Sequence, residues 1–180
     1  MVSTKVFDLK ELNCSVKKLE IADADLLQRL YEKCADYNYL MEGQPPSPTA
    51  ALDEFTAIPA GTSLDDKYML GIFDSENELI GLIEGIQHYP KKGSWWIGLI
   101  MLAPAHRRRG ILHFLIKEFE RWIALQGMDC IMGSVSEAND KVLRLWKQIG
   151  FQVVRSVRRE DSNLLSSFSV IKRKVRYSND

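Results

Sequence analysis

The 180 residues are enough for one domain with its own hydrophobic core, and 24 Lys and Arg residues balance 24 Asp and Glu residues. This zero net charge argues against a general binder of nucleic acids or membranes, and the unpaired spacing of Cys14, Cys34 and Cys130 argues against a disulfide framework. The N-terminus is charged and no apolar run is long enough to cross a membrane, so we expect a single domain, residues 1–180, in the cytoplasm.

The first third of the chain predicts one strand and two helices. The strand covers residues 14–21. A helix is predicted over residues 23–41, because one set of side chains recurs at helical spacing: Leu26, Leu27, Leu30, Tyr31 and Cys34. The proline-rich stretch 42–48 interrupts any regular element, and a second, shorter helix is predicted over residues 49–55.

Three strands follow, over residues 67–74, 78–89 and 95–102, with short polar turns between them. The last of these reads WWIGLIML, an apolar run typical of a central strand that is buried on both faces. Glycines lie inside these strands at Gly81, Gly85 and Gly98. A glycine inside a strand indicates a bulge or the close approach of another group, so we expect crowding there.

The strongest helical pattern covers residues 111–126, where an apolar stripe ends at Gly127. The elements that follow are a strand, a helix and two strands: residues 129–135, 139–149, 151–157 and 164–172. In the second of these, four side chains are predicted to face inward: Val142, Leu145, Trp146 and Ile149. The order of the elements predicts an α/β fold in which helices pack on a mixed sheet.

A basic stretch, LAPAHRRRG, lies at residues 102–110, where the strongest helix begins. A helix N-terminus presents unpaired N–H groups and a partial positive charge, so it attracts anions. Placing Arg107, Arg108 and Arg109 there is unfavourable unless an anion binds or the side chains extend into water. A polyphosphate would satisfy the amides and the guanidinium groups, and Gly110 would let the backbone approach it. Two hypotheses remain, a phosphate-binding loop and a solvated basic loop.

This loop and a second motif resemble the GNAT superfamily of acetyl-CoA-dependent N-acetyltransferases. The superfamily's pyrophosphate loop reads [RQ]-x-x-G-x-[GA], which Arg107 and Gly110 match. Its second motif begins at an asparagine and ends at Gly-Phe, as Asn139 and residues 149–151 do here. The resemblance implies a mixed, mostly antiparallel central sheet of about seven strands flanked by about four helices.

The resemblance also implies a function. It predicts an N-acetyltransferase that transfers the acetyl group of acetyl-CoA, its cosubstrate, to a primary amine of a small molecule, amino acid or peptide by direct attack. The zero net charge predicts no nucleic-acid or membrane partner, and a homodimer stays open because the last predicted strand could pair with another chain. The cofactor-binding residues implied are two on the strand that would pair with pantetheine, Ile100 and Leu102, and a set near the pyrophosphate: Arg107, Arg108, Arg109, Gly110, Ile111, Leu112 and Asn139.

Two residues depart from the superfamily pattern. Leu112 stands where glycine or alanine is usual, and its side chain would crowd the pyrophosphate unless it points to the core. Trp146 takes the catalytic place of a tyrosine proposed to protonate the leaving thiolate, and an indole N–H is no practical proton donor. Because a thiol pKa is about 8.5, the thiolate is already a fair leaving group. Trp146 therefore either slows transfer or simply fills the core.

Glu84 is the predicted catalytic base. It lies in GLIEGIQ between Gly81 and Gly85, and a carboxylate among apolar neighbours must be paired or have a raised pKa. The alternative is an exposed glutamate on a half-solvated face. His88 is a second candidate because histidine titrates near neutral pH, although it lies at a strand end. No spacing of His, Cys and carboxylates suggests a metal site.

Other aromatic residues have open roles. Trp95 and Trp96 point to opposite faces of one strand, so one is expected in the core and the other along the acceptor channel. Tyr37 and Tyr39 precede the proline-rich stretch and belong either to a lid or to ordinary packing.

Two further functions compete with acetyl transfer. Leu112 and Trp146 motivate a CoA-binding sensor or interaction module without turnover. The basic loop and the basic tail, residues 171–176, motivate a binder of phosphate backbones, which the zero net charge disfavours.

Overall fold

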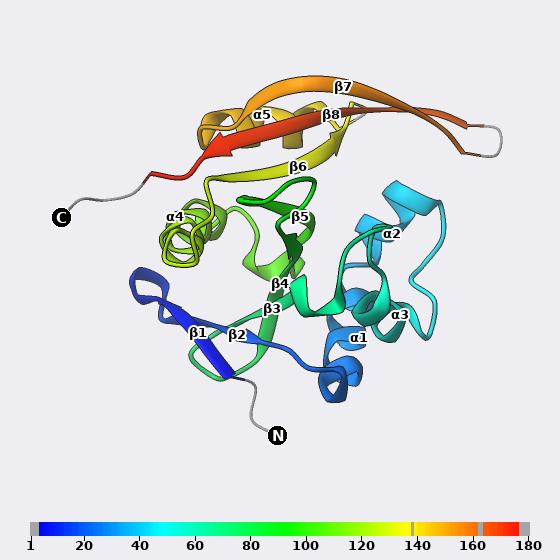
Figure 1. The fold of residues 1–180 in the computed structure, drawn as a ribbon. Helices are drawn as coiled ribbons and strands as arrows, with labels where there is room; N and C mark the ends of the chain where they lie inside the picture. The colour runs from blue at the N-terminus through cyan, green and yellow to red at the C-terminus, as the bar shows by residue number, and fades with distance from the viewer. Residues whose placement is uncertain (1–3, 138, 162–163, 177–180) are drawn as a thin grey trace. The chain divides into compact units, whose positions relative to one another are not determined.

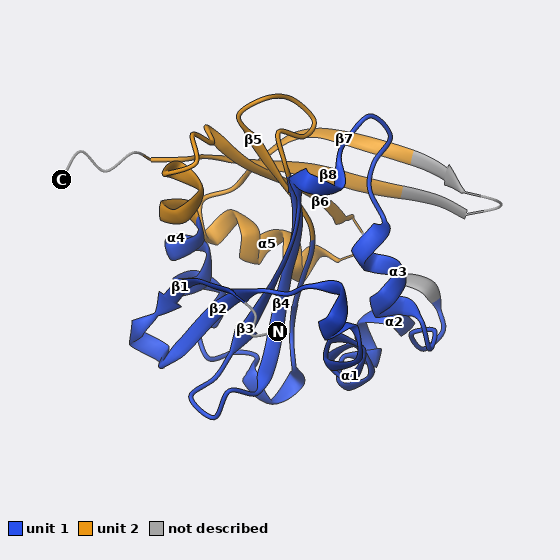
Figure 2. Cartoon of the chain, turned by 60° about the horizontal axis from the view of Figure 1, so that its bottom comes forward, with its two compact units in different colours: residues 1–86, 99–119 blue, residues 87–98, 120–180 orange. Residues whose placement is uncertain are grey.

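The computed structural model describes residues 4–137, 139–161 and 164–176, and the chain divides into two compact units (Figure 2). Unit 1 comprises residues 1–86 and 99–119, and unit 2 comprises residues 87–98 and 120–180. Strand β5 (Ser94–Leu102) and helix α4 (Ile111–Ala124) contribute residues to both units.

Unit 1 contains four strands that pair antiparallel in chain order: β1 (Thr4–Leu9), β2 (Cys14–Lys18), β3 (Lys67–Phe73) and β4 (Leu79–Gln87). Strand β1 was not predicted. It reads TKVFDL, lies at the edge of the sheet and exposes most of its side chains at least partly, so no apolar alternation marks it. Strand β2 is shorter than predicted, because Ile21 begins a 3₁₀ turn.

The helices of unit 1 are α1 (Ala24–Lys33), α2 (Ala35–Glu42) and α3 (Ala50–Thr56). The single helix predicted over residues 23–41 is thus two, which meet at Cys34. Its predicted apolar face is nevertheless buried, since Leu27, Leu30 and Cys34 are each at most 1% exposed in a cluster with residues of β3 and β4. Burial of each leucine contributes about 1.5–3 kcal/mol, which fixes α1 on the sheet.

Gly81 lies where β4 is crowded, as the sequence predicts. The β3–β4 register shifts at this point, since Ile72 pairs with Gly81 but Phe73 pairs with Leu79. A Cβ atom at Gly81 would lie 2.7 Å from Leu102 Cδ2 and 2.8 Å from the Met101 carbonyl oxygen. The second of these is backbone and cannot rotate away, so the glycine lets β5 approach.

We therefore expect Gly81→Ala to lower the free energy of unfolding by about 1–3 kcal/mol, because the added methyl group displaces the backbone of β5. Urea denaturation monitored by circular dichroism measures this loss. A variant as stable as the wild type would contradict the crowding.

Unit 2 contains the beginning of β5 together with β6 (Cys130–Ser136), β7 (Gln152–Asp161), β8 (Leu164–Lys174) and α5 (Asp140–Gln148). Strands β5 and β6 pair in parallel, whereas β8 pairs antiparallel with both β6 and β7 (Figure 1). Trp95 is fully buried and packs edge-on against Trp122 of α4, with ring centroids 5.4 Å apart. The prediction that Leu145 faces inward is wrong, because it is 41% exposed while Trp146 is buried.

The strands form one sheet in the order β1-β2-β3-β4-β5-β6-β8-β7, which confirms the predicted mixed, mostly antiparallel α/β fold. The described residues hold eight strands and five α-helices, one more of each than predicted, because of β1 and the division at Cys34. The prediction that residues 95–102 are buried on both faces is wrong, because Gly98 is exposed and three other residues are half-buried: Leu99, Ile100 and Leu102. None of the described helices has the length and apolar character that crossing a membrane requires.

Candidate functional site

The basic loop connects β5 to α4 in unit 1. A 3₁₀ turn, Pro104–His106, is followed by Arg107–Arg109 and by Gly110, and α4 begins at Ile111. Arg108 and Gly110 both have left-handed backbone conformations, with φ of 63° and 75°. The His113 amide donates to the Gly110 carbonyl at 3.0 Å, so this carbonyl already belongs to the first turn of the helix. The amides of Ile111 and Leu112 open the helix, where no preceding turn supplies an acceptor, so they can donate to an anion.

Arg107 is bound within the protein. Its Nε donates to the Leu102 carbonyl at 2.8 Å, and both of its terminal nitrogens contact the Asp36 carboxylate, with Nη2–Oδ1 at 2.9 Å. The hydrogen bond from Arg107 lowers the pKa of Asp36 below its usual range. This bidentate pair joins the loop to α2, so two exposed arginines, Arg108 and Arg109, are the cations that remain for an anion.

The start of α4 leaves room beside the loop. A Cβ atom at Gly110 would meet only Phe114 Cε2, at 4.0 Å, so the glycine serves its positive φ rather than a close contact in this structure. Ile111 is buried and Leu112 is half-buried, so Leu112 is neither fully in the core nor fully exposed. The half-buried Ile100 and Leu102 lie on the part of β5 that precedes the loop. The Leu102 carbonyl already accepts two hydrogen bonds within the protein, one from Arg107 Nε and one from Cys34 Sγ at 3.5 Å.

Glu84 is buried, not exposed on a half-solvated face. It is 6% exposed, and its Oε1 lies 3.2 Å from Nζ of Lys67, which is itself 5% exposed. Lys67 pairs with Ile86 across the β3–β4 ladder and Met69 pairs with Glu84, so Lys67 and Glu84 are diagonal neighbours on one face. The predicted base therefore has the ion-pair partner that its burial requires.

The Lys67 ammonium joins three acceptors. Besides Glu84 it contacts Glu54 Oε1 at 2.9 Å and donates to the Ala57 carbonyl at 2.6 Å. Both of these acceptors come from α3 or its C-terminal end. Neither Lys67 nor Glu54 was predicted from the sequence. The only signal was the β3–β4 hairpin, whose register makes Lys67 and Glu84 neighbours once it is known.

Burial raises the pKa of Glu84 to about 7. The Lys67 charge opposes that rise, Glu54 adds to it, and hydrogen bonds from Lys67 and from the backbone of Leu99 oppose it. A carboxyl group with this pKa is both protonated and ionised near neutral pH, so it can accept and return a proton. The buried Tyr31 hydroxyl has no partner among the described residues, and burial raises the pKa of Tyr31, so it stays a neutral phenol.

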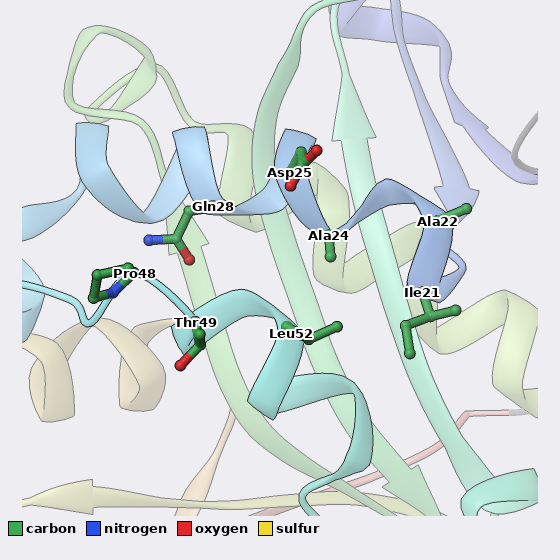
Figure 3. Close-up of a pocket in the computed structure, with 8 residues that line it drawn as sticks. All are labelled: Ile21, Ala22, Ala24, Asp25, Gln28, Pro48, Thr49 and Leu52. Atoms are coloured by element: carbon green, nitrogen blue, oxygen red, sulfur yellow. The ribbon is translucent and has the colours of Figure 1, made fainter.

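A pocket of about 280 Å³ lies between the N-terminal ends of α1 and α3 (Figure 3). Ile21 and Leu52 give it apolar walls, and Asp25 supplies a charge. Gln28 joins the two segments, since its Nε2 donates to the Ser47 carbonyl at 2.9 Å and its Oε1 accepts from the Ala51 amide at 3.1 Å. None of the Glu84, Lys67 or Glu54 side chains lines this pocket, so it is separate from the Glu84 network.

The predicted site residues of unit 2 have local structural roles. Asn139 is the N-cap of α5, and its side-chain oxygen accepts from the Val142 amide at 3.3 Å. Trp146 is 5% exposed and packs edge-on against Phe151, with ring centroids 4.7 Å apart. That packing favours the core interpretation of Trp146 over a catalytic one.

The remaining candidates are also engaged locally. Nδ1 of His88 accepts from the Gly93 amide at 3.3 Å. Trp96 is half-buried and packs edge-on against Tyr89, in contrast to the buried Trp95. The described residues contain no group of His, Cys, Asp and Glu side chains arranged to hold a metal ion.

Comparisons with known proteins identify one family. Residues 24–151 match the acetyltransferase (GNAT) family. An acetyltransferase from Thermus thermophilus has a TM-score of 0.72 at 17% identity, with 91% of this chain and 97% of that chain covered. A probable GNAT acetyltransferase from Chromobacterium violaceum has a TM-score of 0.75 at 15% identity, with 97% of this chain and 87% of that chain covered.

A third similar structure contains a ligand. The spermidine N-acetyltransferase from Vibrio cholerae, in complex with CoA and spermine, has a TM-score of 0.70 at 19% identity, with 91% of this chain and 96% of that chain covered. At these identities the likeness to solved structures concerns the fold. No curated protein matches the chain.

Proposed function

Since the chain belongs to the acetyltransferase (GNAT) family and is an acyltransferase, we propose that it transfers the acetyl group of acetyl-CoA to a primary amine of a small molecule, amino acid or peptide. The observation that carries this proposal is the buried Glu84 carboxyl on β4, whose pKa is about 7. We place the reaction in the cytoplasm, in keeping with the free thiols of Cys14, Cys34 and Cys130.

The residues of the basic loop fit the diphosphate of acetyl-CoA. The left-handed Gly110 has open space where a Cβ would lie, and Arg108 and Arg109 are exposed residues of the loop that leads into α4. Arg107 has the different task of holding this loop to Asp36. Acetyl-CoA supplies the activated acetyl thioester. Ile100 and Leu102 belong to β5, the strand that leads to the loop and would pair with the pantetheine arm. Asn139 caps α5, so its contribution to cofactor binding is indirect, through the position of that helix.

Glu84 acts on the acceptor amine. An amine with a pKa of about 10.4 is protonated at neutral pH, so it must lose a proton before its nitrogen can attack. The Glu84 carboxylate takes that proton, directly or through a water molecule. Lys67 holds the carboxylate in place, and its three acceptors keep Lys67 itself from moving.

The departure of the thiolate needs no acid from α5. A thiol pKa of about 8.5 makes the thiolate a fair leaving group without a proton donor. Trp146 then keeps its packing role against Phe151. Without a proton donor at this position, acetyl transfer is slower but still occurs.

Acetyl-CoA binding and turnover test the proposal separately. At a concentration of about 100 times Kd, acetyl-CoA is expected to stabilise the fold by about 2.7 kcal/mol, which a thermal shift detects. Release of the CoA thiol over a panel of primary amines then reports transfer. Stabilisation without thiol release from any amine would indicate the alternative function, a CoA-binding module without turnover. No stabilisation at millimolar acetyl-CoA would contradict the cofactor assignment.

A variant without the two exposed arginines tests the role of the loop in acetyl-CoA binding. We expect Arg108→Ser/Arg109→Ser to weaken acetyl-CoA binding by about tenfold to hundredfold, because charge-assisted hydrogen bonds to phosphate are lost. Isothermal titration calorimetry at two salt concentrations measures the change and its salt dependence. The control is Lys117→Ser, which removes an exposed charge farther along α4. Equal affinities for the double variant and the control would remove the loop from the binding site.

A further inference from the structure

A second basic site lies in unit 2. A pocket of about 190 Å³ opens between the turn that precedes β5, the start of β6 and the end of β8. Four lysines line it, Lys91, Lys92, Lys172 and Lys174, against a single acidic side chain, Asp129. Four positive charges and one negative charge give the lining a net formal charge of +3. None of its residues belongs to the loop of Arg107–Gly110.

Strand register explains why half of these lysines gather here. Cys130 pairs with Lys174 and Met132 pairs with Lys172, so the two lysines lie on one face of β8. Arg173 between them points to the opposite face, where it binds the Glu120 carboxylate and the Ile149 carbonyl. The basic tail noted in the sequence thus divides: its arginine stabilises the fold, and two of its lysines face the pocket.

The four ammonium groups have no carboxylate partner among the described residues. Lys91, Lys92 and Lys174 are exposed and Lys172 is half-buried. Like charges around one cavity repel each other, so the arrangement favours an anion that reduces the repulsion.

Backbone hydrogen bonds connect the segments that frame the pocket. The Asp129 amide donates to the Gly93 carbonyl at 2.6 Å, and the Val175 amide donates to the Asp129 carbonyl at 2.9 Å. Ser94 is fully buried at the pocket wall, and its Oγ accepts from Cys130 Sγ at 3.4 Å.

We propose that this pocket binds a phosphate group, either as inorganic phosphate or as a phosphate monoester. A doubly charged phosphate matches the excess positive charge better than a monocarboxylate does, and its oxygens accept from several ammonium groups at once. A pocket of this volume holds a small anion rather than a chain. The site is independent of acetyl transfer, because no residue of the proposed reaction lines it.

Calorimetric titration at constant ionic strength tests the proposal, with inorganic phosphate and phenyl phosphate as probes. The Arg108→Ser/Arg109→Ser protein is the background, so that the loop before α4 does not contribute. We expect saturable binding of at least one probe, and Lys172→Gln/Lys174→Gln in the same background is expected to weaken it by tenfold or more. The preferred probe distinguishes free phosphate from an ester.

The matched control is Lys141→Gln/Lys147→Gln, which removes two exposed lysines of α5, and it is expected to bind as the background does. Circular dichroism verifies that each variant is folded. Lack of saturable binding of both probes would overturn the proposal. An equal loss in the pocket variant and in the control would also overturn it, because general charge would then explain the binding.

Discussion

Replacing Glu84 with glutamine is expected to lower kcat/KM for acetyl transfer by about 100-fold or more and to leave the affinity for acetyl-CoA nearly unchanged. General-base catalysis contributes about 10²–10⁴-fold, and glutamine keeps the shape of the side chain while it loses the basic oxygen. Glutamine also keeps an oxygen for the Leu99 backbone and for Lys67, so the fold is preserved. Steady-state kinetics with the most active amine of the panel measures the loss.

The pH dependence distinguishes a base from a merely structural carboxylate. Glu84 is active as the carboxylate, so kcat/KM of the wild type is expected to rise with pH through about 7 and the Glu84→Gln profile to lack that rise. The control is Glu76→Gln in the exposed β3–β4 turn, which should keep the wild-type profile. Wild-type turnover in Glu84→Gln would exclude Glu84 as the base.

The raised pKa of Glu84 also links stability to pH. Between about pH 4.5 and 7 the folded protein keeps a proton on Glu84 that the unfolded chain has released. The stability that this proton contributes is fully present below about pH 4.5, the pKa of the unfolded chain, and is lost as the pH rises through about 7, the pKa in the folded protein. Urea denaturation at both ends of this range should therefore show Glu84→Gln gaining stability relative to the wild type as the pH rises.

Replacing Lys67 with methionine is expected to lower the free energy of unfolding by about 3–5 kcal/mol. The variant removes the cation between two carboxylates, so the buried Glu84 carboxyl must either stay charged without a partner or take up a proton, and both cost stability. It also frees the Ala57 carbonyl and so loosens the end of α3 from β3. Without the Lys67 charge, which lowers the pKa of Glu84, the rise in kcat/KM should move to higher pH.

A double variant separates the ion pair from ordinary packing. Lys67→Met/Glu84→Gln is expected to recover part of the stability that Lys67→Met loses, because the buried carboxylate that lacked a partner is gone. Lys141→Met, at an exposed position of α5, should stay within about 0.5 kcal/mol of the wild type. If Lys67→Met lost less than about 1 kcal/mol, or the double variant recovered nothing, the buried pair would not carry the stability assigned to it.

Elements with local signals could be predicted from the amino-acid sequence. Apolar residues at helical spacing marked α1 and α4, because a helix on a sheet must bury one face. Gly127 and Gly150 marked helix ends, and both have the positive φ that glycine adopts without strain. Glu84 stood out because its neighbours along the strand are apolar, which already required a partner or a raised pKa.

The contacts between residues far apart in the sequence became visible in the folded chain alone. Arg107 and Asp36 are 71 positions apart, and nothing near either residue shows that the arginine binds a carboxylate within the protein. Likewise, α3 brings Glu54 to Lys67, and the register of β8 separates Arg173 from its lysine neighbours. Spacing along a chain reports the face on which a side chain lies. Its partner depends on how separate elements pack, and that is set by the burial of the whole core.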